Sequence, residues 1–596
     1  MSDSYFETDD VTKEYDSRLV RRILSYLKPY RSLVFLALAA LVFSTLGELS
    51  IPVLLQRIID IAILGKNIPY LMWGCILYLT ILMLVFGFTF LQTWTVNLMT
   101  QRVMKDIRLE LFRKTLSQST SFLSRHPVGR LVTRLTGDVE TMDEFFTTVL
   151  SAFLKDISIM AGTLVTMFIL SPELALIVMV TLPPVLILTL VSRVKARDAF
   201  RLQRTASSKT NAYLAERLAG IQVVQLFRQE KKSAGEYRER CRELLRANLG
   251  EMYVFATFRP LVEWFSTLTA AVVIVIGSKM VYAQSAGSIS ISLGVLIAFI
   301  NLVQMFFQPV TDIAEKYTLL QSAMAGGERV FSLLDTDEHI PDTGTKSIDG
   351  IVRGHVEFDN VRFAYKKGEA VLKGLSFAVK PGEMAAIVGY TGAGKTTIIN
   401  VLARLWDIND GEIRLDGIPV KDIPLHELRR SVMPVMQDIT LFSGTVEENI
   451  CLGLDLSQDE IIEAAKTVYA HEFISSLPNG YKTVLSEGAS NISTGQRQLI
   501  SFARVIAHNP RVVILDEATS SIDTETERLI QLGLKKVLAG RTSFVIAHRL
   551  STIKNADRIM VLSSGCLVEE GSHEELISCN GLYSKLYQLQ YEETSH

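Results

Sequence analysis

Long apolar runs alternate with strongly polar segments through the first half of the chain, and they stop near Pro309. A helix needs about 20 apolar residues to cross the hydrocarbon core of a bilayer. Runs of that kind predict six membrane-spanning helices: Leu33–Leu55, Leu71–Trp94, Val149–Leu170, Leu174–Val191, Leu261–Tyr282 and Ile289–Val310. The fourth span contains Pro183 and Pro184, so we expect a kink there.

Lysine and arginine residues cluster before the first span and directly after the second and fourth spans. Because positive charge concentrates on the cytoplasmic side, these segments and both termini are predicted to be cytoplasmic. Apolar residues keep helical spacing after the second span, at Val103, Ile107 and Leu111, and the stretch 211–232 is also typical of a helix. The spans should therefore continue as long helices beyond the membrane.

Polar residues inside membrane spans are candidate sites for cargo, because burying them in lipid is costly. The candidates for a substrate cavity are Asp156, Glu263, Asn301 and Gln304, with Glu48 as a further possibility. The alternative for each is a hydrogen bond between helices or a position at the membrane boundary. Lys155 and Asp156 are adjacent and do not share a helix face, so they are not expected to pair with each other.

Composition narrows the class of protein further. The 596 residues carry a formal net charge of −2, which gives no overall nucleic-acid-binding character, and 48% of them are hydrophobic. None of the five cysteines forms a CxxC pair, so neither a zinc site nor a disulfide framework is predicted. The first ten residues are acidic and lack an apolar run, so no cleavable signal peptide is expected.

The second half of the chain has the pattern of a soluble α/β domain and contains a glycine-rich loop. Residues 389–397 read GYTGAGKTT and match G-x-x-x-x-G-K-[ST] between a strand pattern and a helix pattern. Backbone amides of such a loop and the following helix N-terminus hold phosphates, the lysine meets the β and γ oxygens, and a hydroxyl binds Mg²⁺. The predicted nucleotide-binding residues here are Gly389, Thr391, Gly392, Gly394, Lys395, Thr396 and Thr397.

A second apolar strand ends in two acids, within the residues RVVILDEATSSID at 511–523. Two carboxylates at the end of a buried strand are costly unless they serve a cation or a reaction. Asp516 suits Mg²⁺, through water, and Glu517 suits a base that polarises an attacking water. The alternative is a strand merely capped by acids.

Together these motifs resemble the ATP-binding cassette (ABC) transporters, and within them the half-size exporters, over nearly the whole chain. The resemblance implies a type I/IV exporter fold. An all-α domain of six transmembrane helices with an N-terminal elbow helix would occupy residues 1–340, and an α/β P-loop ATPase domain would occupy residues 341–596. It also implies further roles: Tyr365 stacks on adenine, Gln437 lies beside Mg²⁺, Asp523 belongs to the D-loop, and His548 contacts the γ-phosphate.

One motif departs from the family pattern. The signature that reads LSGGQ in the family reads Ile492-Ser493-Thr494-Gly495-Gln496 here. In the closed dimer this motif faces the ATP bound by the other chain, so Ser493, Thr494, Gly495 and Gln496 would serve the trans site. A branched side chain replaces a glycine that permits close approach. The chain therefore resembles the catalytically competent subunit of a bacterial heterodimeric multidrug-type exporter, whose partner carries an intact signature; the alternative is a homodimer that tolerates threonine.

The resemblance implies alternating access driven by ATP and Mg²⁺ in the cytoplasmic membrane, with export of amphipathic small molecules, lipids or peptides and no nucleic-acid partner. Coupling helices are expected at 136–145 and 211–220, and an elbow helix at 17–30. Two other classes remain open: a soluble ATPase clamp, against which the six spans argue, and a siderophore-type importer that uses the exporter fold.

Overall fold

The computed structural model describes residues 17–284, 291–348, 352–366, 368–516, 524–546 and 553–588. The chain forms two compact units. Unit 1 is Met1–Leu116 with Val128–Thr336, and unit 2 is Ser117–Pro127 with Asp337–His596. The backbone therefore passes between the units three times, at 116/117, 127/128 and 336/337.

The elements of unit 1 are all helices among its described residues, and short turns join them. Six of its helices are long and apolar enough to cross a membrane, as predicted, although the last begins at Leu293 rather than Ile289. The elements are α1 Ser17–Ser25, η1 Lys28–Tyr30, α2 Arg31–Arg57, η2 Ile58–Ile63, α3 Ile68–Ser117, α5 Val128–Thr133, η3 Arg134–Asp138, α6 Val139–Glu144, η4 Phe145–Leu150, α7 Ser151–Leu170, α8 Pro172–Ala219, α9 Ile221–Leu226, α10 Glu230–Gln284 and α11 Leu293–Asp335.

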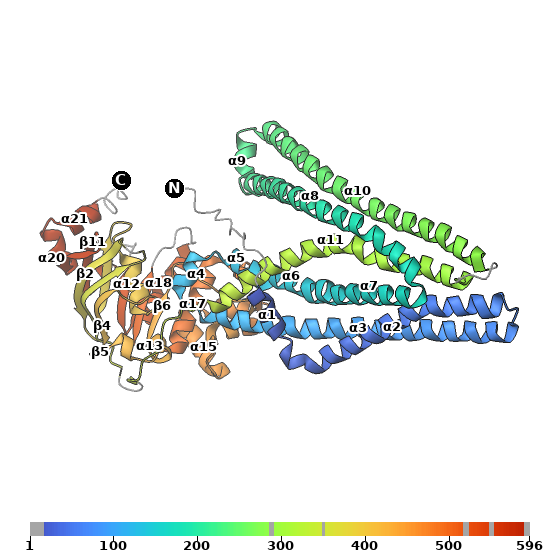
Figure 1. Cartoon of the computed structure of the whole chain (residues 1–596). Coiled ribbons are helices and arrows are strands. Elements are labelled where there is room, and N and C mark those ends of the chain that lie inside the picture. Colours follow the sequence, from blue (N-terminus) through green and yellow to red (C-terminus); the bar gives the residue numbers. More distant parts are fainter. Residues whose placement is uncertain are drawn as a thin grey trace. The chain divides into compact units, whose positions relative to one another are not determined.

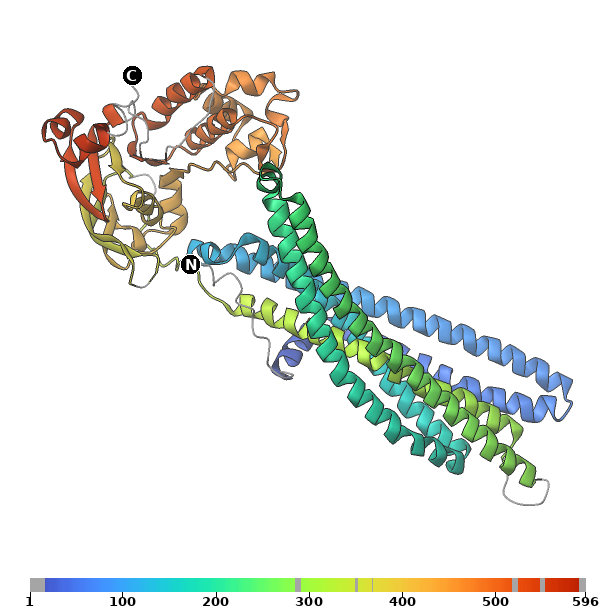
Figure 2. The ribbon, with the colours of Figure 1, turned by 90° about the horizontal axis from the view of Figure 1, so that it is seen from above.

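Three helices extend well beyond the length that a bilayer requires, which confirms the predicted extensions. Helices α3, α8 and α10 have 50, 48 and 55 residues. Figures 1 and 2 show α8 and α10 side by side as a long hairpin with α9 near its tip. Helix α8 continues through Pro183 and Pro184 as one helix.

The connection between α8 and α10 differs from the sequence prediction. The stretch 211–232 is not one helix, because α8 ends at Ala219 and α9 is a separate six-residue helix. Gly220 lies at the break, and Arg228 has φ of 51°, which no helix accommodates. The expected coupling segment 136–145 is also not separate, because it lies within the continuous helical run Val128–Leu170. Two separate short α-helices instead lie between long helices of the described residues: α4, Thr120–Arg125, after α3, and α9 between α8 and α10.

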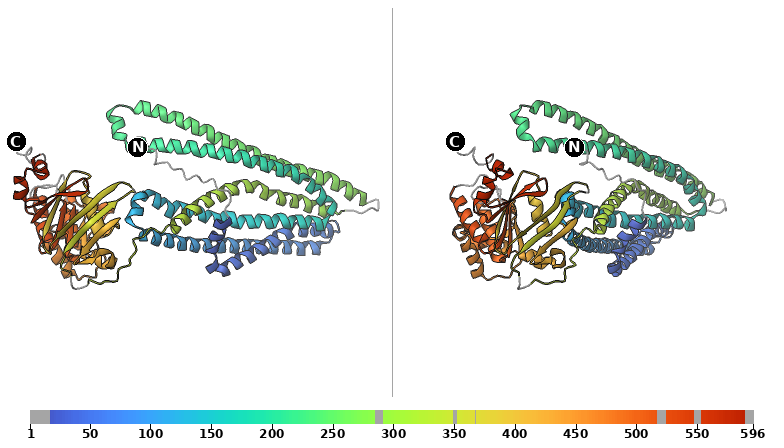
Figure 3. Two further views of the ribbon diagram at one scale, coloured as in Figure 1. Left: turned by 60° about the vertical axis from the view of Figure 1, so that its left-hand side comes forward. Right: turned by 90° about the vertical axis from the view of Figure 1, so that its left-hand side faces the viewer.

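The core of unit 1 lies where α7, α8, α10 and α11 meet. Met167, Val178, Val273 and Phe299 are among the fully buried side chains there. Figure 3 shows α11 running beside α7, and the two helices are in contact. The outer faces of α2 and α3 expose many large apolar side chains, which fits a surface that faces lipid.

Unit 2 contains two main sheets among its described residues. Five strands of the larger sheet are parallel, in the order β11-β3-β10-β9-β6, and β12 joins β11 antiparallel. The smaller antiparallel sheet has the order β2-β1-β4-β5. The strands are β1 Val356–Ala364, β2 Ala370–Val379, β3 Met384–Gly389, β4 Asp410–Leu415, β5 Ile418–Pro419, β6 Val432–Val435, β7 Gly444–Thr445, β8 Val484–Leu485, β9 Val512–Asp516, β10 Thr542–Ile546, β11 Arg558–Ser563 and β12 Cys566–Gly571.

Helices pack against the parallel sheet of unit 2, whose central strands are almost wholly buried, as parallel strands require. The helices are α12 Lys395–Leu402, α13 Leu425–Ser431, α14 Val446–Cys451, α15 Gln458–Thr467, α16 His471–Ser476, α17 Thr494–His508, α18 Thr524–Leu538, α20 His573–Ser578 and α21 Leu582–Tyr587. An all-α membrane part followed by an α/β unit is thus confirmed.

Candidate nucleotide site and membrane polar residues

The glycine-rich loop joins β3 to α12, as the sequence predicts. Gly389 ends the strand with φ of 155°, and a Cβ there would lie 2.3 Å from the carbonyl oxygen of Leu562. Gly392 and Gly394 have φ of 85° and 102°, where any other residue would be strained. Glycine is therefore required for the loop to curl tightly before α12 begins at Lys395.

The side chain of Lys395 forms hydrogen bonds to the backbone of this loop. Its Nζ donates to the carbonyl oxygens of Gly389, at 2.7 Å, and Tyr390, at 3.1 Å. Burial lowers the pKa of the Lys395 ammonium, and the Asp516 carboxylate partly offsets that effect. A cation held by two carbonyls beside open loop amides suits a phosphate group, which would compete for the same ammonium. Thr391 and Thr396 are exposed at this loop.

Tyr365 lies beside the same loop, although 32 residues separate it from Thr397 in the sequence. Its hydroxyl donates to Thr397 Oγ1 at 3.2 Å and accepts from Asn400 Nδ2 at 3.0 Å. The Tyr365 ring meets Trp406 edge to face, with centroids 4.8 Å apart, and 38% of the residue is exposed. A half-exposed aromatic ring held against the phosphate loop fits the predicted adenine contact.

Strand β9 places the Asp516 carboxylate where it could bind a Mg²⁺ ion that is held by a phosphate group. Strand β9 ends at Asp516 and pairs in parallel with both β6 and β10. Gln437 follows β6 two residues after Val435, which is in register with Leu515, so Gln437 and Asp516 leave neighbouring strand ends. The oxygens of Thr396, Gln437 and Asp516 are of the kind that Mg²⁺ prefers. Glu517, Asp523 and His548 lie outside the described residues.

The signature segment forms an ordinary helix start despite its threonine. Ser493 caps α17: its Oγ accepts from the Gln496 amide at 3.2 Å, and Gln496 Oε1 accepts from the Ser493 amide at 3.0 Å. Thr494 Oγ1 accepts from Arg497 Nη2 at 2.9 Å, and Nη1 of the same arginine donates to the Gly488 carbonyl at 3.1 Å. Thr494 is exposed whereas Gly495 is buried. The chain's own fold therefore accommodates the substitution, and its effect falls on whatever approaches this helix end.

The hydrogen bonds and ion pairs of the four cavity candidates in unit 1 do not join them into one cluster. Asp156 accepts from Lys316 Nζ of α11 at 2.5 Å, and only 13% of each side chain is exposed. Glu263 lies 3.5 Å from Arg259 on the exposed face of α10. Asn301 donates to the backbone of Ile297 on its own helix, and Gln304 is exposed.

Lys155 and Asp156 pair in different directions, as expected for adjacent helical residues. Lys155 Nζ donates to Glu48 of α2 at 2.9 Å, while Asp156 contacts α11. Sequence reasoning did not single out Lys316, nor the bidentate pair of Arg329 on α11 with the largely buried Asp138. Lys316, Asp138 and Arg329 lie close to other charged residues in the sequence, so no local sequence signal singles them out.

Comparison with known proteins covers both units. Residues 34–310 match the family model for the ABC transporter transmembrane region, and residues 372–520 match the model for the ABC transporter. The chain is 37% identical to the uncharacterized ABC transporter ATP-binding protein YknV of Bacillus subtilis, over 98% of this chain and 97% of that protein. It is 33% identical to an ATP-dependent lipid A-core flippase of Syntrophus aciditrophicus, over 96% and 95%. It is 36% identical to a probable multidrug resistance ABC transporter ATP-binding/permease protein, YheH, of Bacillus subtilis, over 85% and 75%.

Proposed function

Because this chain belongs to the ABC transporter family, as a half-transporter of the exporter type, we propose that it exports amphipathic molecules as one half of a heterodimer. It is a multi-pass membrane protein and an ATP hydrolase coupled to transport. We place it in the cytoplasmic membrane with both termini inside, because lysine and arginine flank the ends of the long inner helices.

In the proposed cycle the chain's own residues hold ATP and polarise water. Lys395 and the loop amides would take the phosphates, while Thr396, Gln437 and Asp516 would hold Mg²⁺, which neutralises the developing charge. Tyr365 would carry the adenine. Glu517 would orient the attacking water and His548 would contact the γ-phosphate, as the family resemblance implies for these two positions.

The heterodimer proposal rests on Thr494. In a closed dimer the start of α17 would approach the nucleotide of the other chain, where the backbone amides of its first turn serve an anion. Thr494 is exposed at that turn and held by Arg497, so a branched side chain occupies space that glycine would leave open. A self-dimer would carry this obstruction at both sites. A heterodimer with an intact partner signature would carry it at one site only.

The experiment compares the chain purified alone with the chain co-purified with the half-transporter encoded beside it. We expect ATPase activity and transport from the pair, with one ATP retained per pair after hydrolysis of the other. A chain that hydrolyses ATP and transports at the full rate alone would overturn the heterodimer while leaving the exporter assignment intact.

The cargo class follows from the membrane part. The relatives include a protein named as a lipid flippase and one named as a multidrug transporter. Three ion pairs join helices of unit 1, Lys155 with Glu48, Lys316 with Asp156 and Arg329 with Asp138, and this pairing favours amphipathic or lipid-like cargo over strongly charged cargo. Glu263, Asn301 and Gln304 are our candidates for the cavity lining, and Asp156 would act there only by leaving Lys316.

Importer activity is the alternative that uses the same architecture. Inside-out vesicles separate the two directions: an exporter accumulates cargo in them on addition of ATP, whereas an importer depletes preloaded cargo. A panel of dyes, lipids and peptides that stimulate ATPase activity identifies the cargo to use.

A further inference from the structure

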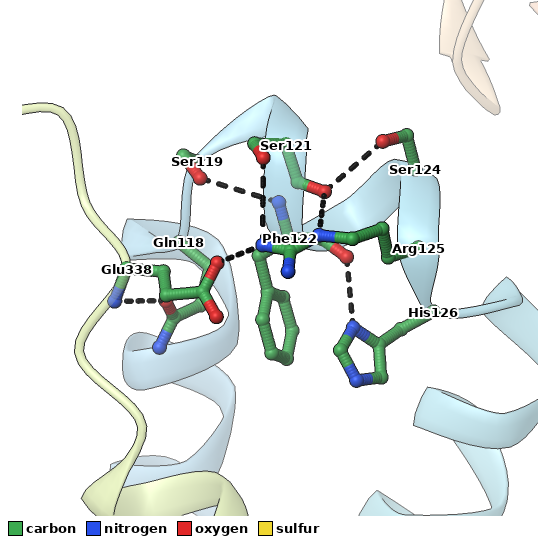
Figure 4. Close-up of polar contacts among 8 residues, drawn as sticks. All are labelled: Gln118, Ser119, Ser121, Phe122, Ser124, Arg125, His126 and Glu338. Atoms are coloured by element: carbon green, nitrogen blue, oxygen red, sulfur yellow. Dashed lines mark hydrogen bonds and ion pairs between the residues drawn. The ribbon is translucent and has the colours of Figure 1, made fainter. Parts of the chain in front are cut away.

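The three places where the backbone passes between the units lie close to a single cluster in unit 2. Gln118 follows the first passage, Arg125 precedes the second, and Glu338 follows the third. Gln118 lies two residues before the short helix α4, Arg125 is the last residue of that helix, and Glu338 belongs to the linker that leaves α11. Figure 4 shows these residues converging, with the linker beside the turn that opens α4.

Glu338 is held through its amide, its carbonyl and its side chain at once. Its amide donates to Gln118 Oε1 at 3.0 Å, and its carbonyl oxygen accepts from the Ser119 amide at 2.7 Å. Its carboxylate forms an ion pair with Arg125 Nη2. Gln118 is 7% exposed, so the contact that fixes the Glu338 amide is shielded from water. The linker is thus bonded to the loop by backbone and side chain together.

The loop side of this cluster is braced by its own contacts. Ser119 caps α4 by accepting from the Phe122 amide at 3.2 Å, and Phe122 is 2% exposed. The His126 ring stacks on Phe122 with centroids 4.1 Å apart, and its Nδ1 contacts the Phe122 carbonyl at 2.9 Å. Arg125 Nε donates to the Ser121 carbonyl at 3.2 Å. A helix of six residues is marginal alone, so these contacts fix Arg125 where Glu338 meets it.

We propose that Glu338 is a positioning residue: it fastens the linker to the first cytoplasmic loop of its own chain, so that the segments at all three passages move as one body during ATP turnover. The inference rests on the proposed function. We call the contact between Glu338 and Arg125 the clamp. An exposed ion pair contributes little stability, so we assign the clamp a geometric role. It holds the linker and the loop in fixed positions, so that closure of the ATPase part displaces α11 and α3 together.

The first test replaces the ion pair by a covalent bond. In full-length transporter without its five native cysteines, Arg125→Cys with Glu338→Cys is bridged by a short bis-methanethiosulfonate reagent and then reduced. The unbridged double variant should hydrolyse ATP roughly two- to fivefold more slowly than its parent, the scale of one exposed ion pair. Bridging should restore the rate, and reduction should lower it again. A bridge that stops turnover means that the clamp must open, and a bridge without effect means that it does not matter; either result overturns the proposal.

The second test reverses the charges. Arg125→Glu and Glu338→Arg should each lower kcat for ATP roughly two- to fivefold, because like charges then face each other, with KM for ATP unchanged. The double exchange should recover most of the parental kcat. Arg130→Glu is the matched control, because Arg130 is exposed and forms no ion pair with any described residue. A double exchange no faster than the single variants overturns the clamp, whereas a parent without ATPase activity contradicts the proposed function instead.

Discussion

Thr494 accepts a hydrogen bond from Arg497 and leaves the capping box of Ser493 and Gln496 intact. The substitution thus has no visible cost to the fold of its own chain. If its cost falls on the nucleotide of the facing chain, then restoring glycine should change hydrolysis at every site that the signature of this chain faces.

We expect Thr494→Gly to raise the ATPase rate of the chain purified alone, because it removes the side chain that crowds the facing phosphate. In the heterodimer the same change should act mainly on the site that retains ATP. Thr494→Ser is the control, because it keeps the hydroxyl that accepts from Arg497. Steady-state ATP hydrolysis measures both, and an equal rate for all three proteins would mean that threonine is harmless at this position.

Glu517→Gln keeps the shape of the side chain and removes the charge that would polarise water. Binding of ATP should persist while turnover falls by orders of magnitude, as expected for an interaction made in the transition state. Asp459→Asn, a change on the exposed first turn of α15, is the control for charge removal in unit 2. Turnover near the parental rate would reassign the catalytic base.

At the scale of elements, the Asp156–Lys316 pair joins α7 to α11 with both side chains largely buried. We expect Asp156→Asn to lower the free energy of unfolding by about 2–4 kcal/mol, since the variant removes a carboxylate charge that a largely buried ammonium contacts. Glu263→Gln should change it by less than about 1 kcal/mol, because its pair with Arg259 is exposed. Thermal unfolding in lipid nanodiscs compares the two. A role in the cavity lining alone would instead change cargo-stimulated ATPase activity with no loss of stability.

The start of α11 meets the C-terminal end of α2 and the following η2 at a position that only glycine fits. Asp60 Oδ1 accepts from the Gly294 amide at 2.9 Å, and a Cβ on Gly294 would lie 2.4 Å from the Gln56 carbonyl oxygen. Gly294→Ala should therefore destabilise unit 1 by about 1–3 kcal/mol through overpacking. Gly87→Ala is the matched control in α3, where an added Cβ has no neighbour within 4 Å, and it should be neutral or slightly stabilising. Equal unfolding temperatures for the parent, Gly294→Ala and Gly87→Ala would show that the two helix ends can move apart without loss of stability.

The spans and the phosphate loop could be predicted because their signals are local. Runs of apolar residues define α2 or α7, and the positions of Gly389, Gly394 and Lys395 define the loop. The partners of charged residues could not be predicted. Lys316 lies 160 residues from Asp156, and Glu338 lies 213 residues from Arg125, separations over which periodicity carries no information. The break at Gly220 was missed because the apolar pattern continues on both sides of it.

At the scale of the whole molecule, the prediction concerns the side of the membrane that unit 2 faces. ATP is supplied in the cytoplasm, and positive residues flank the cytoplasmic ends of the predicted spans, so unit 2 should face the same side as both termini. Native cysteines allow this to be tested, because Cys566 and Cys579 are exposed in unit 2.

A membrane-impermeant maleimide should label these two cysteines in inside-out vesicles and leave them unlabelled in intact cells. Lys66, exposed between η2 and α3, should show the opposite pattern after Lys66→Cys in a protein without native cysteines, because two helices that cross the membrane meet there. A permeant maleimide that labels every site in both preparations controls for reactivity. Labelling of Cys566 in intact cells, or of residue 66 only in inverted vesicles, would require the inverse topology. In that case the nucleotide site would face away from its ATP, and the proposed export cycle could not run.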